Sequence, residues 1–500
     1  MTARADVGGY EGLSPRESTA GDGESSPLET TAVYDASPSV ETTAVYDASP
    51  PVETTARYDA SPPVETTARY DASPPVETTA RYDASPPVET TARYDASPPV
   101  ETTELSADEV RRLTLYAQGF LGAGAKRGGV TAMLRRVSAV QLDTISVLAR
   151  SHELVAYARL GPVGRAAVEG AYWPATKPTT FEYWAHAACI LPIADWPYYA
   201  WRRRAITARG QRWHKVSEDA CEQVLGRLRD EGPLTATQLG GAKAGGPWWD
   251  WSEVKIAAEW LLDTGRAVCV RRIGWRRVYD LPERVIPSEL YEHRATDAEC
   301  LAYLVGTAGR GLGVATHADF IEYQRLNGYG LHLRDGAALD EAAAAAGLVP
   351  VTVPGGRRHV HAWADPAALA WLAAGGRGTH RTALLSPFDS LVWDRKRTLR
   401  MFGYRHLFEP YVPKEKRERG YFTMPLLTGG RIAGWVDPAR EGKTLVARNV
   451  LVDKPAAVVP MARALAEAAQ WVGCSNVATE RVQPGALAQP LAAALKAIGV

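Results

Sequence analysis

The sequence predicts an α+β protein with tandem winged-helix (helix-turn-helix) domains, a small C-terminal β domain and a disordered repeat tail in front of them. Three observations support this fold class. Residues 215–290 and, more loosely, residues 295–375 place apolar residues at helical spacing before two alternating segments joined by a tight turn. Residues 380–452 alternate as β-strands do. Residues 31–103 repeat a short polar unit that cannot form a core.

The N-terminal repeat is twelve residues long and is best seen as Val-Glu-Thr-Thr-Ala-Arg-Tyr-Asp-Ala-Ser-Pro-Pro. One Val and one Tyr per repeat bury too little apolar surface to offset the entropy of ordering, and each Pro-Pro interrupts helix and sheet. We therefore predict a semi-extended, disordered spacer. Its Thr-Thr and Tyr sites would also suit repeated docking or phosphorylation, and its near-identical copies equally fit tandem duplication of a tolerated linker.

The net charge of zero conceals an uneven distribution. Of the 57 basic and 57 acidic residues, 6 Arg and 19 Asp or Glu lie in residues 1–104, so the rest of the chain holds 51 basic and 38 acidic residues. A basic body behind an acidic tail is typical of nucleic-acid-binding proteins. A solvated surface whose charges segregate would give the same count.

Cysteine usage and hydropathy indicate the compartment. The five cysteines are scattered without a C-x-x-C pair, which argues against a disulfide framework or a zinc site and fits a reducing cytosol. No apolar run approaches the ~20 residues of a membrane span, and the N-terminus lacks the pattern of a signal peptide. We expect a cytoplasmic, nucleoid-associated monomer that does not bind membranes.

The folded body is predicted to begin near residue 105 with a capped helix. Ser106 can cap this helix and Glu109 completes a capping box. A second helix, near Thr131–Val137, leads into the segment Gln141-Leu142-Asp143.

A winged helix is predicted next. Ala220–Asp230 has helical spacing, and Ser252–Thr264 is the predicted recognition helix, with Ser252 as its cap. Strand-like segments follow, with Ile273-Gly274-Trp275 at the tip of the wing between them.

The plan repeats more loosely in the next segment, where Pro354-Gly355-Gly356 forms the predicted tip of a second wing. Arg357 and Arg358 beside this tip suit a wing that lies along a phosphate backbone. The predicted domains are a tail (1–104), a first winged-helix and catalytic domain (105–212), a second (213–293) and third (294–378) winged-helix domain, a β domain (379–455) and C-terminal helices (456–500).

The triplet Gln141-Leu142-Asp143 is the candidate catalytic motif. If this segment is extended, side chains two residues apart share a face, so Gln141 and Asp143 would point into one cleft while Leu142 anchors the backbone. On an edge strand, Gln-x-Asp is also common as solvated surface. The triplet alone therefore does not decide between catalysis and surface.

The triplet gains meaning from two further blocks, Phe181–Ala187 and Leu384–Arg395. Together, in this order, the three blocks resemble the AlkZ/YcaQ-like family of winged-helix DNA glycosylases over roughly residues 105–455. The Gln-apolar-Asp motif is similar to the catalytic motif of the YcaQ-type branch, whereas the AlkZ branch has a second Gln where Asp143 stands. The resemblance implies three winged-helix units and a small β domain that form a basic channel.

The implied chemistry is hydrolysis of an N-glycosidic bond in double-stranded DNA. An N7-alkylated purine already carries positive charge, so its base leaves without an added acid and one carboxylate suffices. Asp143 would stabilise the oxocarbenium-like state and orient or deprotonate a water, and Gln141 would hold that water or the sugar. No lysine adjoins the motif, so a lyase step is not indicated, and neither a metal nor a cofactor is required. Bulky adducts and interstrand crosslinks are further possible substrates.

Basic and polar residues near the motif and on the predicted wing are candidate DNA contacts. Each has a structural alternative: helix packing for the residues after the motif, a buried histidine in the second block, and a solvated helix end for the arginine run. For the third block, we expect Asp389, Asp394 and Arg395 to form an internal salt-bridge and turn network. The candidate DNA contacts are Arg150, Ser151, His152, Arg159, His186, Arg202, Arg203, Arg357 and Arg358.

Two other functions fit the sequence. A non-enzymatic winged-helix transcriptional regulator would bind DNA sequence-selectively and release no base. A scaffold whose repeat tail recruits partners would lose its function when residues 1–104 are deleted, whereas a glycosylase would keep its rate.

Overall fold

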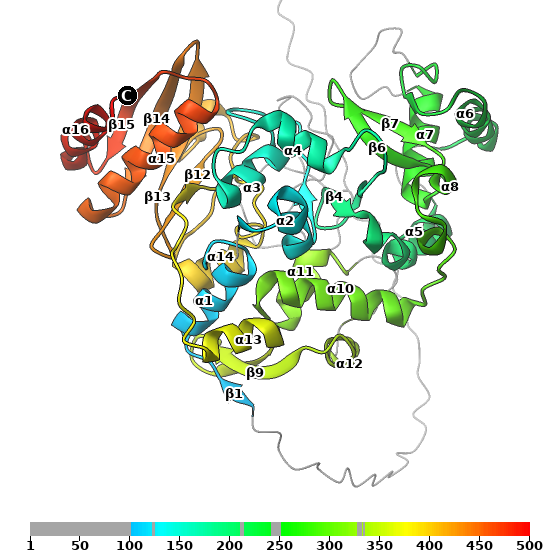
Figure 1. Cartoon of the computed structure of the whole chain (residues 1–500), viewed down its shortest axis with the longest axis horizontal. Coiled ribbons are helices and arrows are strands. Elements are labelled where there is room, and N and C mark those ends of the chain that lie inside the picture. The colour runs from blue at the N-terminus through cyan, green and yellow to red at the C-terminus, as the bar shows by residue number, and fades with distance from the viewer. Residues whose placement is uncertain (1–101, 123–125, 211–214, 242–251, 328–332, 334–335) are drawn as a thin grey trace, which may run out of the picture. The chain divides into compact units, whose positions relative to one another are not determined.

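The computed structural model describes residues 102–122, 126–210, 215–241, 252–327, 333 and 336–500 (Figure 1). The predicted repeat tail therefore lies outside the described part of the chain, apart from its last three residues. The described residues form a mixed α/β protein with several separate sheets. No helix among them is long and apolar enough to cross a membrane.

Three modules follow one another with a shared order: a helix, a short strand, further helix and a β-hairpin. The first comprises α2 (Gly129–Val137), β2 (Val140–Gln141), α3 (Ser151–Leu160), α4 (Arg165–Tyr172), β3 (Thr180–Trp184) and β4 (Ala188–Pro192). The second comprises α6 (Glu218–Glu231), β5 (Leu234–Thr235), α7 (Glu253–Thr264), β6 (Val268–Ile273) and β7 (Arg276–Asp280). The third comprises α10 (Asp297–Leu312), β8 (Val314–Ala315), α11 (His317–Gln324), α12 (Ala337–Ala345), β9 (Val349–Pro354) and β10 (His359–Ala364).

Local sequence signals fix where several of these helices begin. Ser106 and Glu109 form the predicted capping box at the start of α1 (Ala107–Ala117). The Ser252 hydroxyl accepts the N–H of Lys255 at the start of α7, as predicted. These bonds satisfy amide groups that a helix leaves unpaired in its first turn.

The hairpins of the first and second modules join into one six-stranded sheet, in the order β2-β4-β3-β6-β7-β5. The junction is antiparallel and pairs Glu182 on β3 with Cys269 on β6. The two modules thus share backbone hydrogen bonds as well as side-chain packing.

The third module also binds segments from the start of the described chain. Strand β1 (Thr103–Glu104) pairs in parallel with β9, so ordered backbone pairing begins slightly before the expected residue 105. Helix α1 is tied to the third module, because Gln118 at its C-cap donates to the Gly311 carbonyl oxygen at 2.6 Å. Further helices follow each module in the sequence: η2 (Ile193–Tyr199) and α5 (Ala200–Arg209) follow the first, α8 (Pro282–Val285) and α9 (Ser288–Tyr291) follow the second, and α13 (Pro366–Ala373) follows the third.

The C-terminal part is a five-stranded sheet in the order β11-β12-β13-β14-β15. Its elements are β11 (Ala383–Leu384), α14 (Arg395–Phe402), η3 (Lys414–Lys416), β12 (Met424–Thr428), β13 (Arg431–Glu441), β14 (Thr444–Val452), η4 (Pro455–Ala457), α15 (Val458–Trp471), β15 (Asn476–Gln483), η5 (Gly485–Leu487) and α16 (Ala488–Ile498). Met461, Leu465 and Ala469 on one face of α15 are buried against this sheet.

The sequence prediction of separate C-terminal helices from residue 456 misses strand β15. This strand pairs in parallel with β14, from Thr444 opposite Asn476 to Leu451 opposite Gln483. The sheet therefore continues past residue 455, and α15 is the connection between two of its strands. The strand escaped prediction because its alternation of Val477, Val482 and polar residues is weak.

Candidate active site

Ser151 fixes the turn that carries Gln141 and Asp143. Its hydroxyl donates to the Gln141 carbonyl oxygen at 2.7 Å and accepts the Asp143 N–H at 3.0 Å. Between these bonds, Leu142 is buried in the core of the first module, as its anchoring role requires. Ser151 is the first residue of α3, so the triplet is held between this helix and strand β2. The Ser151 side chain is fully buried, and it positions the triplet rather than contacting DNA.

Asp143 leaves the strand in a turn that its own carboxylate closes. Strand β2 ends at Gln141, so the extended segment is shorter than predicted. The Asp143 Oδ1 accepts the N–H of Ile145 at 2.9 Å, as aspartate does in many turns. Burial raises the pKa of Asp143 to about 6, although N–H groups of Ile145 and Thr144 oppose the rise. Within the described residues, no basic side chain forms an ion pair with it.

Two other buried carboxyl groups show that a raised pKa alone does not mark a catalytic acid or base. Burial raises the pKa of Asp195 to about 7 and that of Asp263 to about 6. Each accepts a side-chain hydrogen bond from an aromatic residue, Tyr303 at 2.6 Å and Trp184 at 2.7 Å. Asp143 differs from both, because in the described chain its carboxylate accepts only backbone N–H groups.

Tyr411 and Gln141 are two further polar residues considered with this turn. Tyr411 is half-exposed, and burial together with the charge of Asp143 raises its pKa to about 12. Gln141 is buried, and its carboxamide makes no hydrogen bond to any described residue. An unpaired carboxamide is available to bind a water molecule or a sugar.

A cavity of about 580 Å³ lies elsewhere in the first module and the C-terminal part. Neither Gln141 nor Asp143 lines it. The cavity is therefore separate from the candidate catalytic turn, and we do not assign it to the reacting base. Its polar lining includes Lys126, Arg159, His380, Arg381, Arg463 and Glu467.

The tip of the second hairpin packs on helix α3, directly after the candidate catalytic turn. Gly274 and Trp275 have φ angles of 54° and 69°, which close the turn between β6 and β7 at the predicted position. The Trp275 ring stacks on His152 at 5.7 Å between centroids, and the Arg150 guanidinium lies 3.9 Å from its centre. The predicted wing tip therefore packs against another part of the protein through Trp275.

His152 is fully buried, so the prediction that it contacts DNA is not supported by its position. Its Nε2 lies 3.8 Å from the Glu169 carboxylate, too far for a direct hydrogen bond, and neither ring nitrogen has a hydrogen-bond partner among the described residues. Trp173 and Trp275 pack against its ring. Arg150 remains partly exposed at the start of α3.

Arg159 is also corrected by the structure. It is fully buried, and its guanidinium forms a two-point ion pair with Asp389, with bonds of 2.6 and 2.9 Å. Gln118 and Ser390 occupy further donors of the same group. A guanidinium enclosed in this way cannot reach a phosphate without breaking the pair. Asp389 thereby forms the internal salt bridge expected for the third block.

The second block is buried as well. His186 stacks face to face on Trp393 of the third block, with centroids 4.4 Å apart, and burial lowers its pKa to about 3. Arg202 is fully buried and donates to backbone oxygens, including that of Gln324 at 2.6 Å. Arg203 donates to the Trp196 carbonyl oxygen at 2.8 Å and lies over its indole. His186 and Arg202 join separate parts of the fold, and Arg203 packs on the neighbouring helix η2, so none of the three points to a DNA contact.

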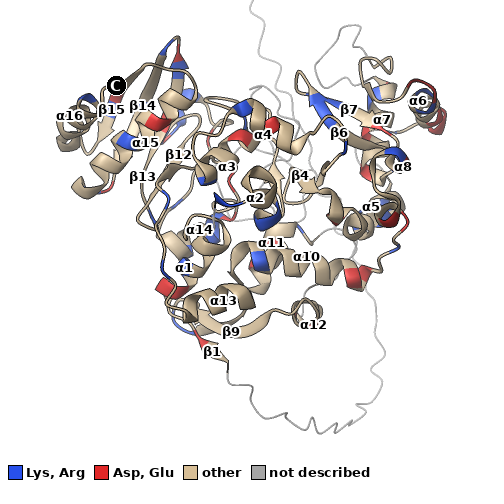
Figure 2. Cartoon of the chain, viewed as in Figure 1, with Lys and Arg blue, Asp and Glu red and all other residues tan. Residues whose placement is uncertain are grey.

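Four exposed arginines lie on the second and third hairpins. Arg357 and Arg358 are exposed beside the tip of the third hairpin, as predicted. Arg271 and Arg276 are exposed on the second hairpin, where Figure 2 shows basic residues gathered on β6 and β7. The sequence contained a signal for this second pair, because Arg-Arg precedes and follows the Ile273-Gly274-Trp275 turn.

Glu182 explains why the other two arginines of the second hairpin are not free. Its carboxylate is buried and accepts bonds from Arg272 at 2.6 and 2.8 Å and from Arg277 at 2.5 Å. Burial alone would raise the pKa of Glu182, but the charges of Arg277 and Arg272 outweigh it and lower the pKa to about 2. This cluster holds the second hairpin on the first.

Three hairpin modules, two of which carry exposed arginines on their hairpins, and a carboxylate that no described basic side chain pairs with are features of an enzyme that acts on nucleic acid. A family model described as "DNA glycosylase AlkZ-like" matches residues 134–473. The match covers most of the chain, which therefore belongs to the AlkZ-like DNA glycosylase family.

A solved structure gives an independent comparison of the fold. The Streptomyces sahachiroi DNA glycosylase AlkZ superposes with a TM-score of 0.51 and 18% sequence identity, over 76% of this chain and 100% of that one. The three sequence blocks that carry the family resemblance also meet in space: Arg159 after the first block binds Asp389 of the third, and His186 of the second stacks on Trp393 of the third.

Proposed function

We propose that this glycosylase is monofunctional and hydrolyses the N-glycosidic bond of N7-alkylated purines in double-stranded DNA. We further place it nearer the YcaQ-type branch, because Asp143 follows Gln141 at the second polar position of the motif. The observation that carries the proposal is the Asp143 carboxylate. It is fixed by a turn, has a raised pKa and lacks a counter-ion among the described residues.

Asp143 has the electrostatic properties that this reaction needs. With a pKa of about 6 the group is mostly ionised at pH 7, so it can stabilise a developing oxocarbenium ion. The same pKa leaves it basic enough to accept a proton from the attacking water. Because an N7-alkylated base leaves without protonation, no second carboxyl group is needed.

Gln141 supports the same step through its carboxamide, which makes no hydrogen bond to a described residue and can hold the water or the sugar. Ser151 acts as a positioning residue, since its hydroxyl joins the backbone on both sides of Leu142. No described element places a lysine in this arrangement, in keeping with hydrolysis rather than a Schiff-base mechanism.

We propose that the three modules are winged-helix domains and that DNA contacts their exposed hairpin arginines. Arg357 and Arg358 on the third hairpin and Arg271 and Arg276 on the second would pair with phosphates. Arg150, at the partly exposed end of α3, is the candidate contact closest in sequence to the catalytic turn.

The test is excision from a duplex that carries a single 7-methylguanine, followed by alkali cleavage at abasic sites. We expect the parent protein to produce breaks and Asp143→Asn to be slower by ~10²–10³-fold, the usual cost of losing one electrostatic contact to the transition state. Binding to the same duplex should stay near normal, because a carboxylate does not pair with a phosphate and its loss removes no such contact. Duplexes with a nitrogen-mustard crosslink then test the larger substrates.

A matched control is Asp263→Asn. This substitution is chemically identical and alters another buried carboxyl group with a raised pKa, but the oxygen of the introduced carboxamide can still accept the Trp184 N–H. It should excise at the parent rate. Excision by Asp143→Asn at the parent rate, or no breaks with the parent protein, would remove the proposed mechanism.

A further inference from the structure

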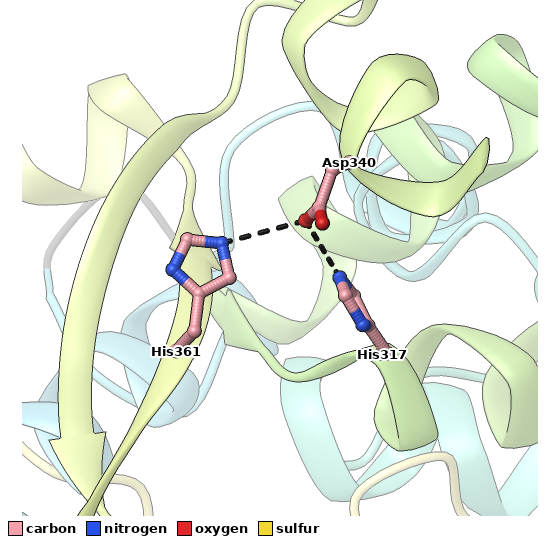
Figure 3. A group of neighbouring side chains, drawn as sticks. All are labelled: His317, Asp340 and His361. Atoms are coloured by element: carbon pink, nitrogen blue, oxygen red, sulfur yellow. Dashed lines mark hydrogen bonds and ion pairs between the residues drawn. The ribbon is translucent and has the colours of Figure 1, made fainter. Parts of the chain in front are cut away.

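Outside the active site, two imidazoles and a carboxylate converge on the third module (Figure 3). His317 begins α11, Asp340 lies on α12 and His361 lies on β10. Both Nε2 atoms face the same carboxylate oxygen, the Asp340 Oδ1, at 2.7 Å from His317 and 3.4 Å from His361. One ligand atom from each of the three residues lies within 4.8 Å of the other two.

We propose that these three residues bind a single zinc-type transition-metal ion. Two imidazole nitrogens and one carboxylate oxygen form a ligand set that Zn²⁺ commonly accepts, with water at the fourth position. Atoms bound tetrahedrally to one ion at ~2.0–2.1 Å lie about 3.3 Å from one another. The pair between Asp340 and His361 already has this spacing, and the pair between His317 and Asp340 needs to open by about half an ångström.

The surroundings hold the ligands in place. Trp363 donates from Nε1 to the Asp340 Oδ1 at 2.8 Å, the kind of outer hydrogen bond that orients a metal-binding carboxylate. The His361 ring packs edge-on against Trp363. Gly336, with a φ of 78°, lets His317 approach the start of α12, because a Cβ there would lie 2.8 Å from the His317 Nδ1.

The ligands are also accessible and come from separate elements. Each of the three side chains is between about one third and one half exposed, so an ion can enter from solvent. A bound ion would tie α11 and α12 to the third hairpin and would stabilise this module by binding only its folded form. No spacing signature marks the site in the sequence, since 23 and 21 residues separate successive ligands.

The test uses the full-length, tag-free protein after treatment with a chelator and titration with Zn²⁺ in a calorimeter. We expect one ion per chain with a dissociation constant in the micromolar range or below. His361→Ala should weaken binding by at least tenfold, because one of three protein ligands is lost. A Co²⁺ titration should give the intense visible absorption of a four-coordinate site in the parent and lose it in this variant.

His359→Ala is the matched control. His359 lies two residues before His361 on the same strand, but its Nε2 pairs with Glu104 at 3.1 Å and it does not belong to the cluster. This variant should bind Zn²⁺ as the parent does. Zn²⁺ should raise the Tm of the parent and of this variant equally. Absence of saturable one-to-one binding, or an equal effect of His359→Ala and His361→Ala, overturns the site. Calorimetry, Co²⁺ absorption and Tm are all independent of base excision.

Discussion

Asp143 follows strand β2, and Glu182 lies on β3, with only β4 between them in the six-stranded sheet. Their electrostatic surroundings are opposite. Arg272 and Arg277 hold the pKa of Glu182 at about 2, whereas burial without a basic partner in the described chain raises the pKa of Asp143 to about 6. Nearby positions in one sheet thus hold a structural anion, Glu182, and the proposed catalytic one, Asp143.

The difference shows what a catalytic carboxylate requires here. A counter-ion stabilises the folded protein, but it also neutralises the charge that a cationic transition state would use. Asp143 keeps its charge available at a cost in folding free energy, and the bonds from Ser151 to the backbone compensate part of it. In this proposal, Glu182 stabilises the fold and Asp143 takes part in the reaction.

The largest effect on stability is expected for Glu182→Gln. The variant leaves Arg272 without its buried counter-charge and leaves Arg277 with Glu259 as its remaining acidic partner. Removing one partner of a buried ion pair typically costs ~3–5 kcal/mol. Urea denaturation at pH 7 measures the loss. Since the pKa of Glu182 is lowered, its contribution is present above pH ~4.5 and disappears as the pH falls towards 2.

The control for this prediction is Glu231→Gln, which breaks the exposed pair with Arg227. An ion pair screened by solvent contributes little to stability, so the midpoint of unfolding should barely move. Equal losses in the two variants would show that the buried cluster does not hold the hairpins together.

Asp143→Asn is expected to increase the stability of the fold, whereas Glu182→Gln decreases it. Because the folded protein raises the pKa of Asp143 above its ordinary 3.8, ionisation destabilises the fold as the pH rises through about 6. The variant should therefore be more stable than the parent at pH 7, by ~1–3 kcal/mol, and the gain should shrink near pH 4. Thermal unfolding at both pH values measures this. A loss of stability at pH 7 would contradict the unpaired state of the carboxylate.

The same ionisation predicts the pH dependence of excision. The single-turnover rate of the parent should rise between pH 5 and pH 7 as Asp143 loses its proton. The residual rate of Asp143→Asn should not follow this curve. If the rate of the parent did not change with pH, Asp143 would not be the catalytic group.

The smallest effects are expected for Arg357→Ala and Arg358→Ala. These side chains are exposed, so stability should stay within about 0.5 kcal/mol. If each contacts a phosphate, the slope of log binding constant against log salt should decrease by about 1 per variant. Titrations of duplex DNA at several salt concentrations measure it, and an unchanged slope would exclude the hairpin tip from the interface.

The sequence predicted local features well. The capping residues Ser106 and Ser252 and the turn at Gly274 are where their short-range signals placed them. The mixed α/β class and the family also followed from spacing and motif order. Such features depend on residues within a few positions of one another.

Burial of polar side chains could not be predicted in the same way. From the sequence, Arg159 is a reasonable candidate for a phosphate contact. In the structure it pairs with Asp389, which lies 230 residues later in the chain. Arg202 binds backbone oxygens of a distant helix end, and His152 is covered by the tip of another module. Whether a cation is free for DNA depends on tertiary partners that neither spacing nor composition specifies.

The antiparallel junction of Glu182 with Cys269 bears on how this protein could be divided or recombined. A fragment that ends after β4 would expose an unpaired strand edge and invite aggregation. A chimaera that imports only the second module would need to rebuild that edge and supply arginines for Glu182. Productive exchange between related enzymes would therefore transfer both modules as one inherited piece.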